Sequence, residues 1–97
     1  MVLGNTEKTD TWIEDTSIAS ILMQLEAEHL GLGSCWVQIR LRESNQEISS
    51  GEYVRRLLKI PEHLAVLSIL AVGYPESRLP GHTLDEVNPG RIHTEVY

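Results

Sequence analysis

The sequence predicts a small α+β domain, and three features of its hydrophobic pattern support this class. One long segment without glycine or proline has helical spacing, a shorter segment alternates with the period of a strand, and a third is an almost continuous apolar run. In chain order the pattern predicts helix, strand, helix, strand and an extended tail. The 97 residues suffice for a single domain, with a core expected over residues 11–78 and the tail over residues 79–97.

The first helix is expected over residues 11–30. Large aliphatic side chains recur there at spacings of three and four residues, and further apolar residues lie to a second side. The recurring residues are Ile18, Ile21, Leu22 and Leu25. A helix this apolar is expected to be buried on more than one face. Thr11 and Glu14 have the spacing of a capping box, and Gly31 stands where a C-terminal glycine cap is expected.

The first strand is expected over residues 34–41, where apolar and polar side chains alternate. We expect the apolar side to be buried, and it comprises Cys35, Val37, Ile39 and Leu41. The polar side comprises Trp36, Gln38, Arg40 and Arg42. Cys35 is the only cysteine, which excludes an internal disulfide, and we interpret it as a small buried residue rather than a reactive thiol.

A second capping box at Ser49 and Glu52 predicts a short helix through Leu58, which Pro61 closes. The apolar run that begins at residue 64 and ends in a Gly-Tyr-Pro turn predicts a central strand buried on both faces. If the two strands are parallel, their helical connection is right-handed. Two strands make a poor sheet, so further strands are expected from residues 1–4, the tail, a partner or sequence outside this chain.

Composition and charge limit the functional classes. The net charge of −6, from 14 acidic and 8 basic residues, disfavours binding to nucleic acid or to anionic membranes. The four histidines are widely spaced and form no metal-binding pattern. No signal peptide is visible and no apolar run is long enough to span a bilayer, so we expect a cytoplasmic protein without membrane contact.

Three motifs together resemble one known family, the flavin-dependent nitroreductases. The motifs are Gly-Leu-Gly-Ser-Cys-Trp at residues 31–36, Gly-Tyr-Pro at residues 73–75 and Ile-His-Thr-Glu-Val-Tyr at residues 92–97. With the helix that precedes them, they extend the resemblance over residues 11–97. The likeness implies that the chain corresponds to the C-terminal half of such a protein and has the nitroreductase-like α+β fold.

The resemblance also implies an activity and a partner. Members of this family bind one FMN per active site at the interface of a homodimer. NAD(P)H reduces the flavin, which then reduces nitroaromatics, quinones or flavins. The C-terminal segments wrap the partner subunit, so residues 79–97 are expected to pack on a second copy of the chain. The alternation at the end of this tail is that of an edge strand added to a neighbour.

The residues expected to touch the cofactor follow from the same likeness. The backbone N–H groups of Gln38 and Ile39 match those near flavin N5 and O4, where a donor favours the reduced flavin. Arg78 matches an arginine that holds the FMN phosphate through its fork of donors. The alternative interpretations are a polar strand residue for Gln38 and a solvated surface arginine for Arg78. Glu76 stands where some relatives carry a basic residue, and its charge opposes a phosphate.

The family's N-terminal half, with its arginine-rich phosphate clamp, has no counterpart in this sequence. One arginine and two amides are too few to offset the entropy lost by ordering a large anionic cofactor. Two alternatives to an FMN-dependent oxidoreductase therefore stay open. One is a non-catalytic domain that associates with itself and binds no flavin, and the other is a half that complements a separate N-terminal half.

Overall fold

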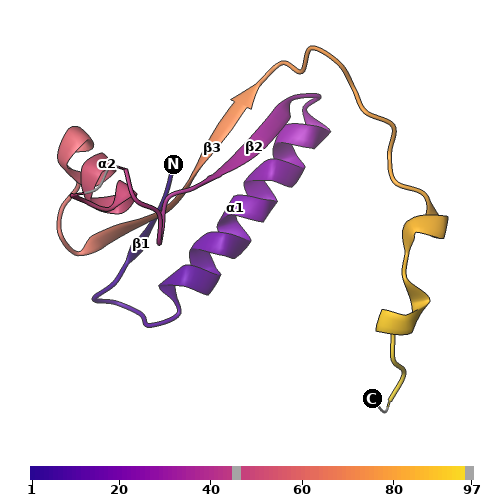
Figure 1. Ribbon diagram of the computed structural model, residues 1–97, viewed down its shortest axis with the longest axis horizontal. Helices are drawn as coiled ribbons and strands as arrows, with labels where there is room; N and C mark the ends of the chain where they lie inside the picture. Colours follow the sequence, from indigo (N-terminus) through magenta and orange to yellow (C-terminus); the bar gives the residue numbers. More distant parts are fainter. Residues whose placement is uncertain (45–46, 96–97) are drawn as a thin grey trace.

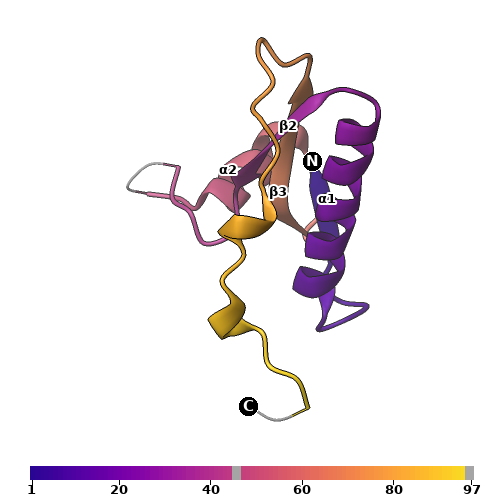
Figure 2. The ribbon, with the colours of Figure 1, turned by 90° about the vertical axis from the view of Figure 1, so that its right-hand side faces the viewer.

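The computed structural model describes residues 1–44 and 47–95, and it has an α+β fold with a three-stranded antiparallel sheet. The strands are ordered β1-β3-β2, and Figures 1 and 2 show α1 along one side of this sheet and α2 on the other. The elements are β1 Val2–Asn5, α1 Trp12–His29, β2 Gly33–Gln38, α2 Ser50–Leu58, β3 Leu64–Gly73 and the 3-10 turns η1 Leu84–Glu86 and η2 Pro89–Arg91.

The predicted central strand is confirmed, because β3 pairs with β1 on one side and with β2 on the other. The short segment at residues 1–4 supplies the additional strand. Both pairings are antiparallel, so the handedness rule for parallel strands does not apply to the connection through α2. Burial on both faces holds only for the middle of β3, where Val66, Leu67 and Ser68 are buried, while its last residues are exposed.

The C-terminal end of α1 forms the predicted glycine cap. Gly31 has φ of +75°, its N–H donates to the Glu28 carbonyl at 2.9 Å, and the Leu32 N–H donates to the Ala27 carbonyl at 2.8 Å. These two bonds form a Schellman motif, which requires a left-handed residue at this position. The capping box predicted at the other end is wrong. The Thr11 hydroxyl caps no backbone N–H and instead donates to the Asp15 carboxylate at 3.2 Å.

Helix α2 begins and ends where the sequence predicts. The Ser49 hydroxyl accepts a hydrogen bond from the Glu52 N–H at 3.1 Å, which satisfies one unpaired donor of the first turn. The Glu52 carboxylate does not complete the box, because it accepts from Arg55 and Arg56 along the helix. Lys59, with φ of 54°, ends the helix in the left-handed region, two residues before Pro61.

The contact between α1 and the sheet is made by small residues. Ser20 and Ser68 are fully buried, and their hydroxyls lie 3.2 Å apart, which joins the middle of the helix to the middle of β3. Ser20 also donates to the Thr16 carbonyl at 2.7 Å. Thr16 and Ala27 complete the buried side of the helix. Side chains this small allow the helix and the sheet to approach closely.

The large aliphatic side chains of α1 lie outside this contact, which corrects the predicted burial of the helix. Ile18, Ile21, Leu22 and Leu25 are each 50–60% exposed. Apolar side chains of the helix lie on more than one side, and the described chain covers only the side with the serines. An exposed apolar surface of this kind is typical of an interaction surface.

The alternation along β2 is confirmed, but within the strand the half-buried side is the opposite of the predicted one. Ile39, which follows the strand, is buried as predicted. Gln38 pairs with Ser68, and residues directly opposite each other share a sheet face. Since Ser68 contacts α1, Gln38 and Trp36 face the helix and are half-buried. Cys35 and Val37 face away and are exposed, so the prediction of a buried cysteine is wrong for the described chain.

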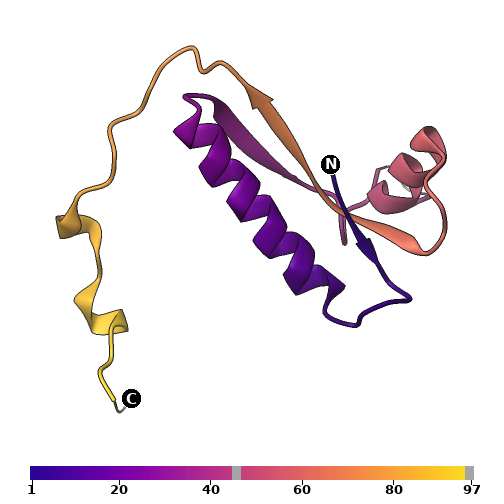
Figure 3. The same ribbon diagram turned by 180° about the vertical axis from the view of Figure 1, so that it is seen from behind.

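The tail after β3 leaves the rest of the molecule, as Figure 3 shows from behind. Residues 74–95 are exposed throughout. The Cα radius of gyration is 17.3 Å, whereas a compact chain of this length has about 12.5 Å. Residues 92–95 form no strand, and residues 96–97 of the predicted edge strand lie outside the described residues. Within the described part, no helix has the length and apolarity needed to cross a membrane.

The charge cluster on α2 leads to a prediction about pH. Hydrogen bonds from Arg55 and Arg56 lower the pKa of the Glu52 carboxyl below its ordinary value of 4.5. A carboxyl whose pKa is lower in the folded chain stabilises the fold above its ordinary pKa, and this contribution is lost as the pH falls through the folded value. Glu52→Gln should therefore unfold at lower urea concentration than the wild type at pH 7, and the difference should vanish in acid.

Glu62→Gln is the matched control for this measurement. Glu62 is 93% exposed and its carboxylate lies 3.7 Å from Arg55, so its removal should change the urea midpoint little at any pH. A constant difference between Glu52→Gln and the wild type from pH 7 to pH 3 would show that the ion pairs do not stabilise α2.

Candidate functional site

The candidate site lies where α1 passes into β2 and where the tail leaves β3. A cavity of about 410 Å³ opens there, within the size range of small-ligand pockets. The C-terminal turn of α1 and the first residues after β3 form its walls. Its lining residues are Glu28, Gly31, Leu32, Gly33, Pro75, Ser77, Arg78, Leu79 and Gly81.

A hydrogen bond between Gly31 and Arg78 joins the tail to the folded body. The Arg78 Nη2 donates to the Gly31 carbonyl at 3.3 Å, although the two residues are 47 positions apart. A Cβ atom at Gly31 would lie 3.0 Å from that same nitrogen. The glycine is therefore required twice, once for its left-handed φ and once for the approach of the guanidinium.

The electrostatics of this cavity suit an anion only in part. Arg78 is its one cationic side chain, and its planar fork of donors suits a phosphate. The Glu28 carboxylate lines the same cavity, and the C-terminal end of α1 contributes partial negative charge. A phosphate would thus meet one positive group and two negative ones. The described residues do not by themselves form a complete site for FMN.

The two backbone donors predicted on β2 differ in their surroundings. The N–H groups of Ile39 and Arg40 both donate to the Leu67 carbonyl, at 3.2 and 3.1 Å, which forms a β-bulge where β2 ends. Because hydrogen bonding alternates along an antiparallel strand, the N–H of Gln38 points away from β3. β2 is an edge strand, so this N–H faces the free edge of the sheet.

The Gln38 side chain is held by a set of hydrogen bonds that the sequence analysis missed. The Trp36 indole N–H donates to Gln38 Oε1 at 2.8 Å, and Gln38 Nε2 donates to the Arg40 carbonyl at 2.9 Å. Trp36, Gln38 and Arg40 follow one another at a spacing of two residues. This spacing in the sequence could have revealed the hydrogen bonds. The bonds fix the strand immediately before the bulge.

Arg78 and Gln38 lie at opposite ends of β2, and the structure does not bring them together. The cavity at Gly31 adjoins the first residue of the strand, and Gln38 is its last. The five residue steps from Gly33 to Gln38 span about 16 Å of extended strand. Only an elongated ligand would reach both positions.

Comparison with known proteins identifies the class. The model of the nitroreductase family matches residues 3–74. A candidate NADH dehydrogenase/NAD(P)H nitroreductase from Archaeoglobus fulgidus is 37% identical over 89 residues, covering 91% of this chain and 48% of that protein. A protein of the same description from Methanothermobacter thermautotrophicus is 42% identical over 86 residues, covering 89% of this chain and 41% of its own length.

The fold agrees with these matches. The solved structure of an FMN-dependent nitroreductase from Clostridium difficile R20291 has a TM-score of 0.92 at 36% identity, over 98% of this chain and 55% of that chain. These matches define an α+β domain of the nitroreductase type. The chain belongs to the nitroreductase family and spans about half the length of the relatives it matches.

The contact at Gly31 leads to a prediction about stability. Gly31→Ala should lower the free energy of unfolding by about 1–2 kcal/mol, because alanine is strained at this φ and its methyl group would displace Arg78. Gly33→Ala is the matched control, since its Cβ would meet Pro75 at 3.4 Å in ordinary contact. Urea denaturation of both variants checks the prediction, and equal stability of the two would contradict it.

Proposed function

We propose that this chain forms part of an FMN-dependent NAD(P)H oxidoreductase of the nitroreductase type, with nitroaromatics, quinones or similar compounds as electron acceptors. The main support is the likeness to an FMN-dependent nitroreductase over 98% of the chain. The relatives described as NADH dehydrogenase/NAD(P)H nitroreductases support the nicotinamide donor. FMN, when bound, would accept hydride from the nicotinamide and pass electrons to the acceptor.

We assign this chain two contacts to the cofactor. The Gln38 N–H at the free edge of β2 would donate to a flavin ring lying along that edge, and Arg78 would bind the phosphate. The Ile39 N–H already donates to the Leu67 carbonyl, so we assign it no contact here. Its expected contact with the flavin stays a prediction. The mixed charges around Arg78 support the view that further cations come from outside the chain.

The same proposal includes a homodimer in which residues 79–97 pack on the partner subunit. Two observations support it. The large side chains of α1 are exposed, and the tail from residue 74 to residue 95 is exposed along its whole length. A tail that covered apolar surface of a second copy would account for both. In such a dimer the core of each subunit would comprise residues 11–78 together with β1, which pairs with β3 and contains the buried Val2.

The alternative, a self-associating domain without flavin, keeps one specific observation in its favour. The exposed apolar surface of α1 explains association, whereas the cavity at Arg78 has too little positive charge to hold a phosphate alone. A visible spectrum of the purified chain distinguishes the two: bound flavin gives a yellow protein, and the alternative gives a colourless one.

A comparison of two flavins tests the role of Arg78. The wild-type chain should bind FMN more tightly than riboflavin, which lacks the phosphate, in a titration followed by flavin fluorescence. Arg78→Ala should weaken FMN binding about tenfold, the effect of one charged hydrogen bond, and leave riboflavin binding unchanged.

Arg91→Ala, which removes an exposed arginine in the same tail, should leave both flavins unaffected. Equal loss of FMN and riboflavin in Arg78→Ala would mean that the arginine acts through the fold rather than on the phosphate. Binding of neither flavin by the wild type would favour the domain without flavin.

A further inference from the structure

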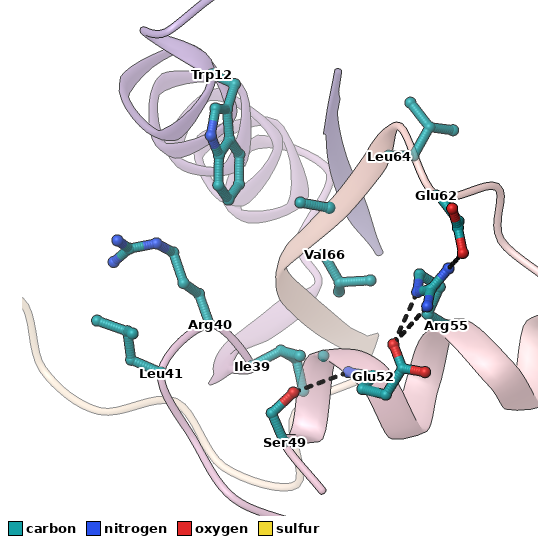
Figure 4. Close-up of a pocket in the computed structure, with 12 residues that line it drawn as sticks. Trp12, Ile39, Arg40, Leu41, Ser49, Glu52, Arg55, Glu62, Leu64 and Val66 are labelled. Carbon is teal, nitrogen blue, oxygen red and sulfur yellow. Dashed lines mark hydrogen bonds and ion pairs between the residues drawn. The ribbon is translucent and has the colours of Figure 1, made fainter. Parts of the chain in front are cut away.

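A second cavity, of about 320 Å³, lies between the end of β2, the start of β3 and α2 (Figure 4). Ile39, which lines this cavity, follows the last residue of β2, whereas Gly33, the first residue, lines the cavity at Arg78. The two cavities therefore lie at opposite ends of that strand. Its lining residues are Trp12, Ile39, Arg40, Leu41, Ser49, Gly51, Glu52, Arg55, Glu62, Leu64, Ala65 and Val66.

The interior of this cavity is apolar. Val66 and Ile39 are 5% and 7% exposed and contribute aliphatic surface, and Ala65 leaves room between the strands and the helix. The Trp12 indole projects from α1 toward Val66 and forms a wall opposite α2 (Figure 4). An aromatic face beside aliphatic surface favours a flat, apolar molecule.

The charges on the α2 side neutralise one another. Glu52 accepts hydrogen bonds from Arg55 at 2.9 and 2.6 Å, and Glu62 lies 3.7 Å from the same guanidinium (Figure 4). Arg56 also donates to Glu52, at 2.5 Å, so two guanidinium groups balance the two carboxylates. These groups satisfy one another and leave little net charge for a ligand.

Arg40 differs from them. In the described part of the chain its guanidinium has no hydrogen-bond or ion-pair partner, and Arg40 lines the cavity together with Trp12 (Figure 4). Its backbone is fixed, because the Arg40 N–H donates to Leu67 in the bulge and its carbonyl accepts from Gln38. The cavity therefore combines an aromatic wall, an aliphatic interior and one uncompensated cation on a rigid backbone.

We propose that this cavity binds an aromatic monoanion of one or two rings, with the ring against Trp12 and the carboxylate or sulfonate on Arg40. The volume lies at the lower end of the range for small-ligand pockets, which limits the size of the ligand. One unpaired guanidinium matches one negative charge, and its fork of donors suits a bidentate carboxylate. The charged contact at Arg40 is separate from the flavin contacts assigned to Gln38 and Arg78, although Ile39, a predicted flavin contact, lines the same cavity.

Calorimetric titration of the full chain with 2-naphthoate tests this proposal. 2-Naphthalenemethanol is the control ligand, because it has the same rings without the charge. Comparing the two compounds on the wild-type chain tests the role of the charge without any substitution. The wild-type chain should bind naphthoate about tenfold more tightly than the alcohol, and Arg40→Gln should abolish this preference. Arg42→Gln removes an exposed arginine two residues away that does not line the cavity, and it should retain the preference.

Three outcomes would overturn the proposal. Equal affinity of the wild type for both compounds, absence of binding by either, or an unchanged preference in Arg40→Gln would each exclude a monoanion site at Arg40. A circular dichroism spectrum of Arg40→Gln establishes that the variant is folded. If it is not, the comparison of the two compounds with wild-type protein decides the question.

Discussion

The structure depends on how α1 is packed. The helix meets the sheet through Ser20, Thr16 and Ala27, and the buried hydroxyl pair of Ser20 and Ser68 fixes where helix and central strand cross. Small side chains permit close approach but bury little apolar area, so this contact alone contributes modest stability. The large apolar side chains of the same helix are directed elsewhere. In the described chain that second surface is exposed.

The two ends of β2 shape the candidate site. Because α1 ends in a left-handed glycine, the chain turns directly into β2 and leaves a cavity beside Gly31 that Arg78 enters from the tail. At the other end of β2 the bulge at Ile39 turns the strand and leaves the Gln38 N–H at a free edge. Each feature is well formed, yet neither makes a cofactor site alone. The Gln38 N–H and Arg78, like the exposed surface of α1, would need further groups to form a site.

Local signals in the sequence predicted the elements well. Helix α2, its cap at Ser49, the glycine cap at Gly31 and the central position of β3 all depend on nearby residues, and all are observed. The capping box at Thr11 is absent because Thr11 lacks the extended backbone of an N-cap residue, and its hydroxyl donates to Asp15. Burial was harder to predict. The apolar side of β2 was expected to face the core, but Ser68 and Ser20 place the side with Trp36 and Gln38 against α1.

The candidate site was predictable only through family resemblance. Periodicity identifies Gln38 as a polar strand residue, and nothing local links Arg78 to Gly31 across 47 positions. The hydrogen bonds around Gln38 and the cavity at Arg40 depend on the bulge, which no pattern in the sequence indicates. Positions set by pairing between distant segments are therefore those for which the structure adds most.

Sedimentation equilibrium of the purified chain, compared with Leu22→Lys, tests the central claim most directly. Leu22 is 60% exposed on the uncovered surface of α1. If that surface is covered from outside the chain, the wild type should sediment as a dimer or larger species and Leu22→Lys as a smaller one. A compact wild-type monomer that unfolds cooperatively, with unchanged mass in the variant, would contradict the account.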